Sequence, residues 1–225
     1  LQSHQCALHG HAVRAVFLAL CTAQQTAGGR LRLRGRCARL SGFLPLYRQP
    51  ECAGAAVADR AGASRSGAGA AAIACLDLLV ALGLNRQNVF VSDSTGVIYE
   101  GRPKTTDPDK LRYAQKTDAR SLADIVVDAD IFLGLSGPGV LKPVMVKTMA
   151  PQPLIMALAN PEPEIRPELA KEARPDCIVC TGRSDYPNQV NNSLCFPFIF
   201  RGALDVGATT INDAMKLATV HAIAE

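Results

Sequence analysis

A glycine-rich turn opens the first clearly patterned stretch of the chain. Residues 67–72 read G-x-G-x-x-A and run directly into a helical pattern over residues 70–82. In dinucleotide-binding turns the first glycine allows a tight turn, the second lets the backbone approach a pyrophosphate, and a small third residue lets helix and strand pack closely. The helix N-terminus then offers free N–H groups to the phosphates. Gly67, Ala68, Gly69 and Ala70 are therefore candidate cofactor-binding residues, with a plain helix start as the alternative interpretation.

An acidic residue follows this turn at the spacing that a dinucleotide site requires. Val89, Phe90 and Val91 predict the next strand, and Asp93 ends it 21 residues after Ala72. An acid at this place accepts hydrogen bonds from the adenosine ribose. A strand before the glycine-rich turn is missing from the pattern, because residues 59–66 make a poor strand.

Neutral amides on polar loops form a second set of candidates. Asn160 follows a buried strand pattern, and Asn191 and Asn192 end a polar loop over residues 184–192. Amides can hydrogen-bond a carboxylate, or the carboxamide of a nicotinamide, without bringing charge into a site of hydride transfer. The alternative is a plain Asn-Pro turn at Asn160 and a loop or helix cap at the asparagine pair.

Histidine and cysteine chemistry is largely excluded. The only histidines are His4, His9, His11 and His221, so residues 12–220 contain no histidine for a Ser-His-Asp triad or a histidine-based dehydrogenase. Cys177 and Cys180 form C-x-x-C in an apolar stretch without a second matched pair, so we interpret them as buried thiols and expect no metal site there. The eight cysteines, without a secretory signal, favour reduced thiols and a cytoplasmic location.

Helical and strand patterns alternate from residue 70 to the C-terminus. Strands are predicted at residues 131–135, 154–158 and 177–180, and helices at 121–127, 141–149, 167–173, 196–204 and 212–224. This alternation predicts an α/β fold with a Rossmann-like, doubly wound parallel sheet. Loops at Gly67, Asp93, Ser136, Asn160 and 182–192 would all leave the carboxyl edge of that sheet. We expect them to converge on one cleft.

The composition excludes other classes. Of the 225 residues, 48% are hydrophobic and 20% charged, which is typical of a globular chain with a core. No apolar run approaches the ~20 residues of a membrane span. There is no tryptophan and only 5% of the residues are aromatic, which argues against stacking platforms for nucleic acid. Residues 67–225 carry 15 basic and 18 acidic residues, so we expect neither nucleic acid nor membrane as a partner.

Residues 1–66 differ in character. They contain nine arginines, two acidic residues, and no lysine, isoleucine, methionine or asparagine. Three interpretations stay open: a basic arm, a targeting peptide, and a GC-rich gene translated out of frame, which alone explains the missing residue types. We therefore expect residues 1–65 to be an irregular or disordered basic segment before a domain at 66–225. Because the chain begins at Leu1, we also expect it to be a fragment.

Five stretches resemble the NAD(P)-binding domain of bacterial malic enzymes. They are residues 66–74 (SGAGAAAIA), 91–102 (VSDSTGVIYEGR), 133–142 (LGLSGPGVLK), 157–162 (ALANPE) and 181–208 (TGRSDYPNQVNNSLCFPFIFRGALDVGA). The likeness is greatest to the NADP-type enzymes that often carry a phosphate acetyltransferase-like domain at the C-terminus. The resemblance covers residues 66–225 and leaves residues 1–65 unmatched.

The resemblance implies oxidation of (S)-malate at C2, reduction of NAD(P), and loss of the β-carboxyl as CO₂ to give pyruvate, in a homo-oligomer. In the family a lysine base, a tyrosine acid and Mg²⁺ or Mn²⁺ held by three acidic residues do this work. Those residues lie upstream of the glycine-rich turn, where this chain has Tyr47, no lysine and no adjacent acids. No catalytic residue or metal ligand is therefore transferred to this chain.

The resemblance also implies ligands for the downstream residues. Residues 67–70 would hold the cofactor pyrophosphate, and Asn160 and Asn191, with Asn192 beside them, would contact malate. Since the catalytic half is absent, we expect the chain alone to be inactive. A cofactor-binding module without chemistry of its own remains the alternative. Amino-acid dehydrogenases share the two-domain plan, but the TGRSDYPNQVNN sequence of residues 181–192 makes membership of that family a distant option.

The sequence features that bear on the choice between NAD and NADP point in different directions. An Asp at the end of the second strand favours NAD, because it pairs with the ribose 2′-hydroxyl and repels a 2′-phosphate. The resemblance favours NADP. Ser94 is compatible with NADP, whereas Thr95 stands where some NADP-specific relatives have lysine. Arg102 and Lys104 would supply positive charge if their loop folds back toward Asp93. We therefore expect NADP in preference to NAD.

Overall fold

The computed structural model describes residues 55–59, 70–103, 107–191 and 194–224. The chain divides into two compact units, one of Cys52–Ile73 with Asn85–Val190, and one of Leu1–Glu51, Ala74–Leu84 and Asn191–Glu225. The first unit holds the sheet and its connecting helices. The second holds most of one long helix and the two C-terminal helices.

A six-stranded sheet organises the first unit. Its strands are β1 (Ala55–Asp59), β2 (Val89–Asp93), β3 (Gly96–Val97), β4 (Ile131–Leu135), β5 (Leu154–Ala157) and β6 (Ile178–Thr181). They lie in the order β3-β2-β1-β4-β5-β6. All neighbouring strands are parallel except β3, which pairs antiparallel with β2 in a tight hairpin. The predicted doubly wound parallel sheet is confirmed, with one short antiparallel strand at its edge.

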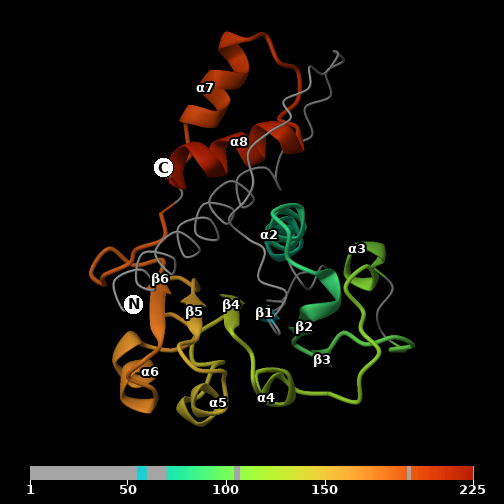
Figure 1. Cartoon of the computed structure of the whole chain (residues 1–225), viewed down its shortest axis with the longest axis vertical. Helices are drawn as coiled ribbons and strands as arrows, with labels where there is room; N and C mark the ends of the chain where they lie inside the picture. The colour runs from blue at the N-terminus through green and yellow to red at the C-terminus, as the bar shows by residue number, and fades with distance from the viewer. Residues whose placement is uncertain (1–54, 60–69, 104–106, 192–193, 225) are drawn as a thin grey trace, which may run out of the picture. The chain divides into compact units, whose positions relative to one another are not determined.

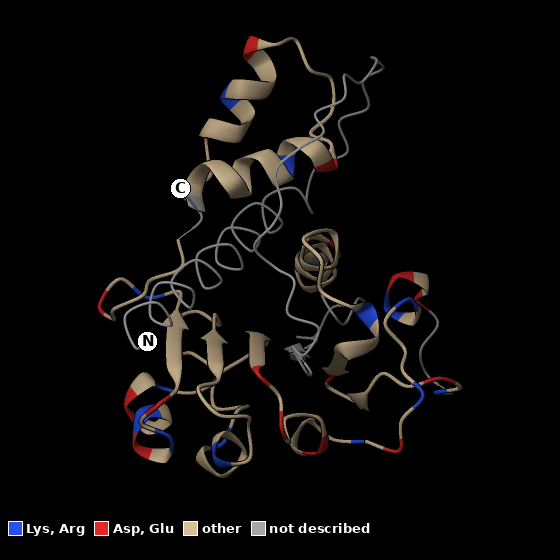
Figure 2. Cartoon of the chain, in the orientation of Figure 1, with Lys and Arg blue, Asp and Glu red and all other residues tan. Residues whose placement is uncertain are grey.

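Short helices cover one face of this sheet. They are α4 (Leu122–Ile125), α5 (Pro143–Lys147) and α6 (Pro167–Ala173) (Figure 1), while α3 (Pro108–Leu111) follows β3 in the chain and does not lie on this face. Both α5 and α6 start with proline at the first helical position, where its missing N–H costs nothing. Ile125, Val146 and Ala170 from these helices form one buried core with Phe132 and Ile155 of the strands. The strands are therefore nearly free of charge, and the charged side chains lie on helices and loops (Figure 2).

The first strand lies upstream of the residues where a strand is missing from the sequence pattern. The chain pairs at Ala55–Asp59, so the prediction of an irregular segment over residues 1–65 is wrong for these five residues. Val57 pairs with Val91 on one side and with Leu133 on the other, so β1 is central in the sheet. Its sequence AAVAD has a single β-branched residue, and its propensity for strand is weak. The segment is a strand because it pairs with β2 on one side and with β4 on the other, and local sequence does not show such pairing. Residues 1–54 and 60–69 lie outside the described residues.

The second unit is helical where it is described. The helix α2 (Ala70–Ala81) runs into it from the first unit, and α7 (Phe198–Asp205) and α8 (Asp213–Ala224) follow. Residues of α7 and α8 line an apolar hollow of about 400 Å³. No helix of the described residues is long and apolar enough to cross a membrane.

Candidate functional site

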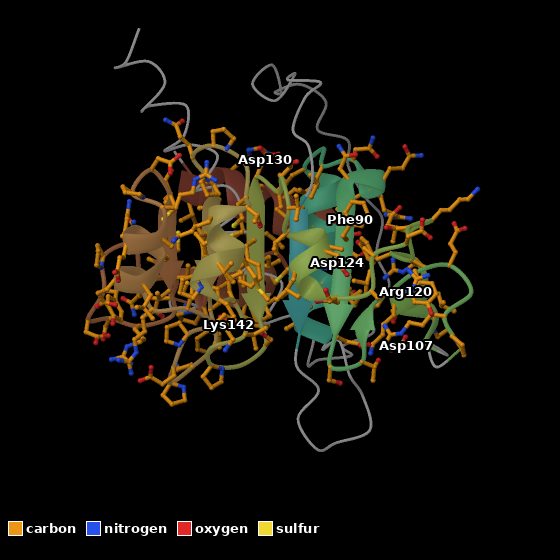
Figure 3. All side chains as sticks on the ribbon, turned by 90° about the horizontal axis from the view of Figure 1, so that it is seen from below. Phe90, Asp107, Arg120, Asp124, Asp130 and Lys142 are labelled. Atoms are coloured by element: carbon orange, nitrogen blue, oxygen red, sulfur yellow. The ribbon has the colours of Figure 1, made fainter. Side chains whose placement is uncertain are left out.

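The carboxyl edge of the sheet gathers the loops that follow its parallel strands. Figure 3 marks the two edges: Asp130 precedes β4 and Lys142 follows it, and they lie at opposite ends of the strands. Because β2, β4, β5 and β6 run parallel, the segments after Asp93, Leu135, Ala157 and Thr181 all leave the edge on the side of Lys142. Four of the five predicted loops therefore leave the carboxyl edge, the loop at Gly67 lies outside the described residues, and their convergence on one cleft stays a prediction.

Asp93 closes β2 at this edge and lies at the centre of an ion cluster. Its Oδ1 accepts hydrogen bonds from the Thr95 backbone N–H at 2.9 Å, the Thr95 hydroxyl at 2.8 Å and the Arg102 guanidinium at 2.7 Å. Its Oδ2 lies 3.5 Å from Nζ of Lys110, which reaches over from α3. The side chains of Asp93 and Arg102 are only 10% and 6% exposed. The hairpin makes this possible, since Gly96 adopts a φ of 109° that L-residues avoid.

These contacts set the charge of the cluster. Burial raises the pKa of Asp93, but the Thr95 backbone and hydroxyl bonds, together with Arg102 and Lys110, outweigh it and lower the pKa below its usual value. The carboxylate is therefore ionised and neutralised by one of two cations, which leaves a net positive group. The sequence predicts Arg102 and Lys104 in this role. Arg102 is confirmed as a neighbour of Asp93, Lys104 lies outside the described residues, and Lys110 supplies the second cation.

A second carboxyl group, which no sequence pattern marks, lies over the ends of β4 and β5. Glu164 is fully buried. Its Oε1 accepts from the backbone N–H of Ser136 at 2.7 Å and the Ser136 hydroxyl at 3.2 Å. Its Oε2 accepts from the Ala159 N–H at 3.0 Å. Burial raises the pKa of Glu164 in spite of these donors. The apolar-flanked N-P-E-P-E-I sequence gave no periodic signal that marks it.

Asn160 lies on the loop that Glu164 holds. It directly follows Ala159, and its side chain is exposed at the carboxyl end of β5. The Asn160–Pro161 peptide bond is cis. The chain bends at Asn160, and the loop presents the Asn160 amide to solvent at the edge of the sheet where doubly wound folds bind ligands. Both interpretations of Asn160 are compatible with this geometry.

The polar loop after β6 lies along the free side of β6, which is the outermost strand of the sheet. The Val190 N–H donates to the Thr181 carbonyl at 2.7 Å, and the Asn188 side chain donates to the Val179 carbonyl at 3.1 Å. Asn188 has a φ of 59°, a conformation that asparagine tolerates better than most residues. Thus much of this loop protects an otherwise unpaired strand edge. Asn191 begins the last segment of the second unit, and Asn192 lies outside the described residues.

The remaining predicted cofactor residues are placed only in part. Ala70 is the first residue of α2, and Ser94 is exposed in the hairpin after Asp93. Gly67, Ala68 and Gly69 lie between β1 and α2, outside the described residues.

Among the described residues, neither a reactive thiol nor a group of metal ligands lies at this edge. Cys177 and Cys180 are both buried, and burial raises the pKa of Cys180 to about 11, so the interpretation as buried thiols is confirmed. In the part of the chain that the structure describes, no three His, Cys, Asp or Glu side chains are grouped so that they could hold a metal ion. The described residues do not fit a Mg²⁺ or Mn²⁺ site.

Strand order, loop positions and the acid at the end of β2 define a doubly wound dinucleotide-binding domain. Residues 57–225 match the family described as "Malic enzyme, NAD binding domain". The chain therefore belongs to the malic enzyme family. The match starts at Val57 inside β1, nine residues upstream of the start expected at residue 66. The sequence pattern does not mark this strand, because it is formed by pairing with β2 and β4.

Individual relatives agree with this assignment. The chain is 68% identical over 161 residues to the NADP-dependent malic enzyme of Escherichia coli, and 64% identical over 159 residues to the NAD-dependent malic enzyme of Rhizobium meliloti. Each match takes 71% of this chain and 21% of the relative, so the chain spans about a fifth of their length. The crystal structure of an NAD-dependent malic enzyme from Thermotoga maritima superposes with a TM-score of 0.69 at 32% identity, covering 95% of this chain and 50% of that one.

Proposed function

We propose that this chain is the dinucleotide-binding half of an enzyme that oxidises (S)-malate and decarboxylates the product to pyruvate and CO₂ while reducing NAD(P). The observation that carries the proposal is the match of residues 57–225 to the malic enzyme NAD-binding domain. It is supported by the strand order β3-β2-β1-β4-β5-β6, in which the order of successive strands reverses between the parallel neighbours β1 and β4, the place where such sheets bind dinucleotides. By analogy with its relatives, we also propose a cytoplasmic homo-oligomer for the intact enzyme.

In this proposal each loop at the carboxyl edge has a task. The turn at Gly67, Ala68, Gly69 and Ala70 holds the pyrophosphate, and the Asp93 hairpin with Ser94 receives the adenosine ribose. The bound nicotinamide supplies the hydride acceptor. The following amides, Asn160 first among them, orient the substrate carboxylate and the nicotinamide carboxamide through neutral hydrogen bonds.

A binding test on Asn160 follows. Asn160→Ala in the intact enzyme should raise KM for malate roughly ten- to hundredfold, the value of one hydrogen bond to a charged group, with little change in stability because the side chain is exposed. Unchanged kinetics would remove Asn160 from the site. Since Asn191 and Asn192 have the same proposed partner, the same assay on Asn191→Ala and Asn192→Ala tests them.

For the cofactor we propose NADP in preference to NAD. The names of the relatives include both, so the argument rests on the Asp93 cluster. Oδ1 of Asp93 already accepts three hydrogen bonds, which leaves it poorly placed to accept from a ribose 2′-hydroxyl. The two cations exceed the one carboxylate in charge. A 2′-phosphate is attracted to such a group, whereas a 2′-hydroxyl gains little.

Calorimetry with NADP⁺ and NAD⁺ tests this choice. The chain should bind NADP⁺ more tightly, and Lys110→Gln should reduce that affinity about ten- to hundredfold, the value of one charge-assisted bond, while leaving NAD⁺ binding within about twofold. Lys116→Gln, at an exposed lysine of the same loop region, is the control and should change neither. A tighter binding of NAD⁺ by the unmodified chain would reverse the assignment.

The second candidate function is a dinucleotide-binding module without catalysis. It is favoured by the absence of a metal-binding group among the described residues. Both candidates bind the cofactor, and we expect the 225-residue chain alone to be inactive. The assay is NADPH or NADH formation from malate with Mn²⁺. Turnover near that of a full-length relative would show that residues 1–66 contribute a catalytic segment.

A further inference from the structure

Glu164 differs from every other acidic residue of the described sheet unit in its surroundings. It is fully buried, and no lysine or arginine among the described residues lies within ion-pair distance of it. A carboxyl group in such a place is costly unless its hydrogen bonds are satisfied. Three donors satisfy it, and they come from two different loops.

The two loops belong to neighbouring strands. Ser136 directly follows β4, and Ala159 and Asn160 follow β5. One oxygen of Glu164 binds the first loop and the other oxygen binds the second. The backbone adds two further links, from the Gly139 N–H to the Pro163 carbonyl at 3.2 Å and from the Leu141 N–H to the Glu164 carbonyl at 3.1 Å. The segment 163–164 thus lies alongside residues 139–141 and ties both loops together.

The strand beneath is shaped for this carboxyl group. Gly134 of β4 lies under it, and a Cβ built there would be 2.5 Å from Cδ of Glu164, closer than real contacts allow. Gly134 pairs with Ala58 of β1 and with Ala157 of β5. Glu164 is therefore placed beside the point where the strand order reverses, over the half of the sheet formed by β4, β5 and β6.

We propose that Glu164 is a positioning residue for the nicotinamide half of the dinucleotide site: its carboxyl group fixes the distance between the Ser136 loop and the Ala159–Asn160 loop. This proposal rests on the proposed function, because it assumes that the carboxyl edge binds a dinucleotide. In doubly wound sheets the first three strands receive one mononucleotide half and the last three the other. Loosening the two loops should therefore weaken contacts to the nicotinamide half and leave the adenosine half unaffected.

The experiment compares two ligands on the full 225-residue chain. NADP⁺ occupies both halves of the site, whereas adenosine 2′,5′-bisphosphate occupies the adenosine half alone. In Glu164→Gln one carboxyl oxygen becomes an NH₂ group that faces an N–H donor. We expect NADP⁺ affinity to fall at least tenfold and the affinity for the bisphosphate to stay within twofold. Glu162→Gln is the matched control: this side chain lies two residues away on the same loop, is 43% exposed and pairs with Arg166 and Arg183 at the surface, so its loss should change neither affinity.

A second measurement does not depend on the cofactor. Hydrogen exchange followed by NMR should show that Glu164→Gln lowers the protection of the Ser136 and Ala159 amides at least tenfold, while amides in β2 keep theirs. If Glu164→Gln does not fold, Glu164→Asp replaces it, because the shorter side chain keeps the charge but cannot reach both loops. It should give the same split between ligands and lose protection at one of the two amides.

Several outcomes would overturn the proposal. Equal losses for the two ligands would show a general structural role, and unchanged NADP⁺ binding would show no role in the site. Unchanged protection of Ser136 and Ala159 would show that Glu164 does not hold the loops. If the unmodified chain binds neither ligand, the proposed function fails, and the exchange measurement alone decides whether Glu164 positions the loops.

Discussion

Asp93 and Glu164 are two carboxyl groups at the same edge of one sheet, and their surroundings differ in burial and in the cations nearby. Asp93 ends β2 within reach of Arg102 and Lys110, and its pKa is lowered. Glu164 covers the ends of β4 and β5, fully buried, with hydrogen-bond donors but no cation among the described residues, and its pKa is raised.

Three donors satisfy the hydrogen-bonding capacity of the buried Glu164 carboxyl group, but they do not offset the loss of hydration that raises its pKa. Each group meets three hydrogen bonds, so the number of donors does not explain the opposite shifts. The difference lies in burial and in the cations, which favour the charged form of Asp93. At the end of β2 the carboxylate and its two cations form a charged group. At the ends of β4 and β5 the Glu164 carboxyl group links two loops through hydrogen bonds.

The largest expected effect is on the Glu164 side. Gly134→Ala places a methyl group against the Glu164 carboxyl carbon, so it should displace that side chain and lower the free energy of unfolding by about 3 kcal/mol. Urea denaturation measures it. Gly182→Ala is the matched control, because its added Cβ would make an ordinary contact at 3.5 Å with the Leu158 carbonyl. Equal losses for both variants would mean that Glu164 does not constrain Gly134.

A somewhat smaller effect is expected on the Asp93 side. Asp93→Asn keeps the shape but leaves Arg102 and Lys110, both nearly buried, without a counter-charge, and should cost about 2 kcal/mol of stability. Asp109→Asn breaks an exposed ion pair with Arg112 and should cost under about 0.5 kcal/mol. Thermal or urea unfolding of the two variants measures both losses of stability. A loss at Asp93 no greater than at Asp109 would show that the cluster is electrostatically unimportant.

Removing one hydroxyl donor from each carboxyl group should have still smaller effects. Thr95→Val deletes the 2.8 Å bond to Asp93, and Ser136→Ala deletes the 3.2 Å bond to Glu164. Each should lower stability by about 1 kcal/mol and raise the pKa of its carboxyl group, because a donor to the charged form is lost. Carbon-13 NMR titration of the two carboxyl groups reads out the shifts. A pKa that falls in either variant would contradict this account.

The smallest signal is the slope of stability against pH, which should have opposite signs for the two groups. The pKa of Asp93 is lowered, so its contribution is present above the unfolded value of about 3.9 and is lost as pH falls through the folded pKa. The pKa of Glu164 is raised, so its contribution is present below about 4.3 and is lost as pH rises through the folded pKa.

Unfolding curves at several pH values, with Asp93→Asn and Glu164→Gln as references, separate the two slopes. The stability difference between the unmodified chain and Asp93→Asn should shrink toward low pH. The difference from Glu164→Gln should shrink toward higher pH. If both differences change in the same direction, the contrast between the two groups is wrong.

The amino-acid sequence by itself determined the fold class and most elements downstream of residue 70. The apolar run at Ile131–Leu135 and the proline-started helix Pro167–Ala173 were predicted with the bounds that the structure has. Such elements carry their own signals, in hydrophobic periodicity, helix starts and turn residues, so they can be recognised locally. The same holds for Asp93, which a fixed spacing from the glycine-rich turn marks.

Only the tertiary structure decided which residues surround the two carboxyl groups and where the sheet begins. Lys110 reaches Asp93 from a helix 17 positions along the chain, and Glu164 binds Ser136 from 28 positions away. No local pattern encodes such distances. The strand Ala55–Asp59 has little propensity of its own and exists because β2 and β4 pair with it on both sides. Contacts between distant segments depend on the packed sheet as a whole, and for that reason they could not be read from spacing or composition.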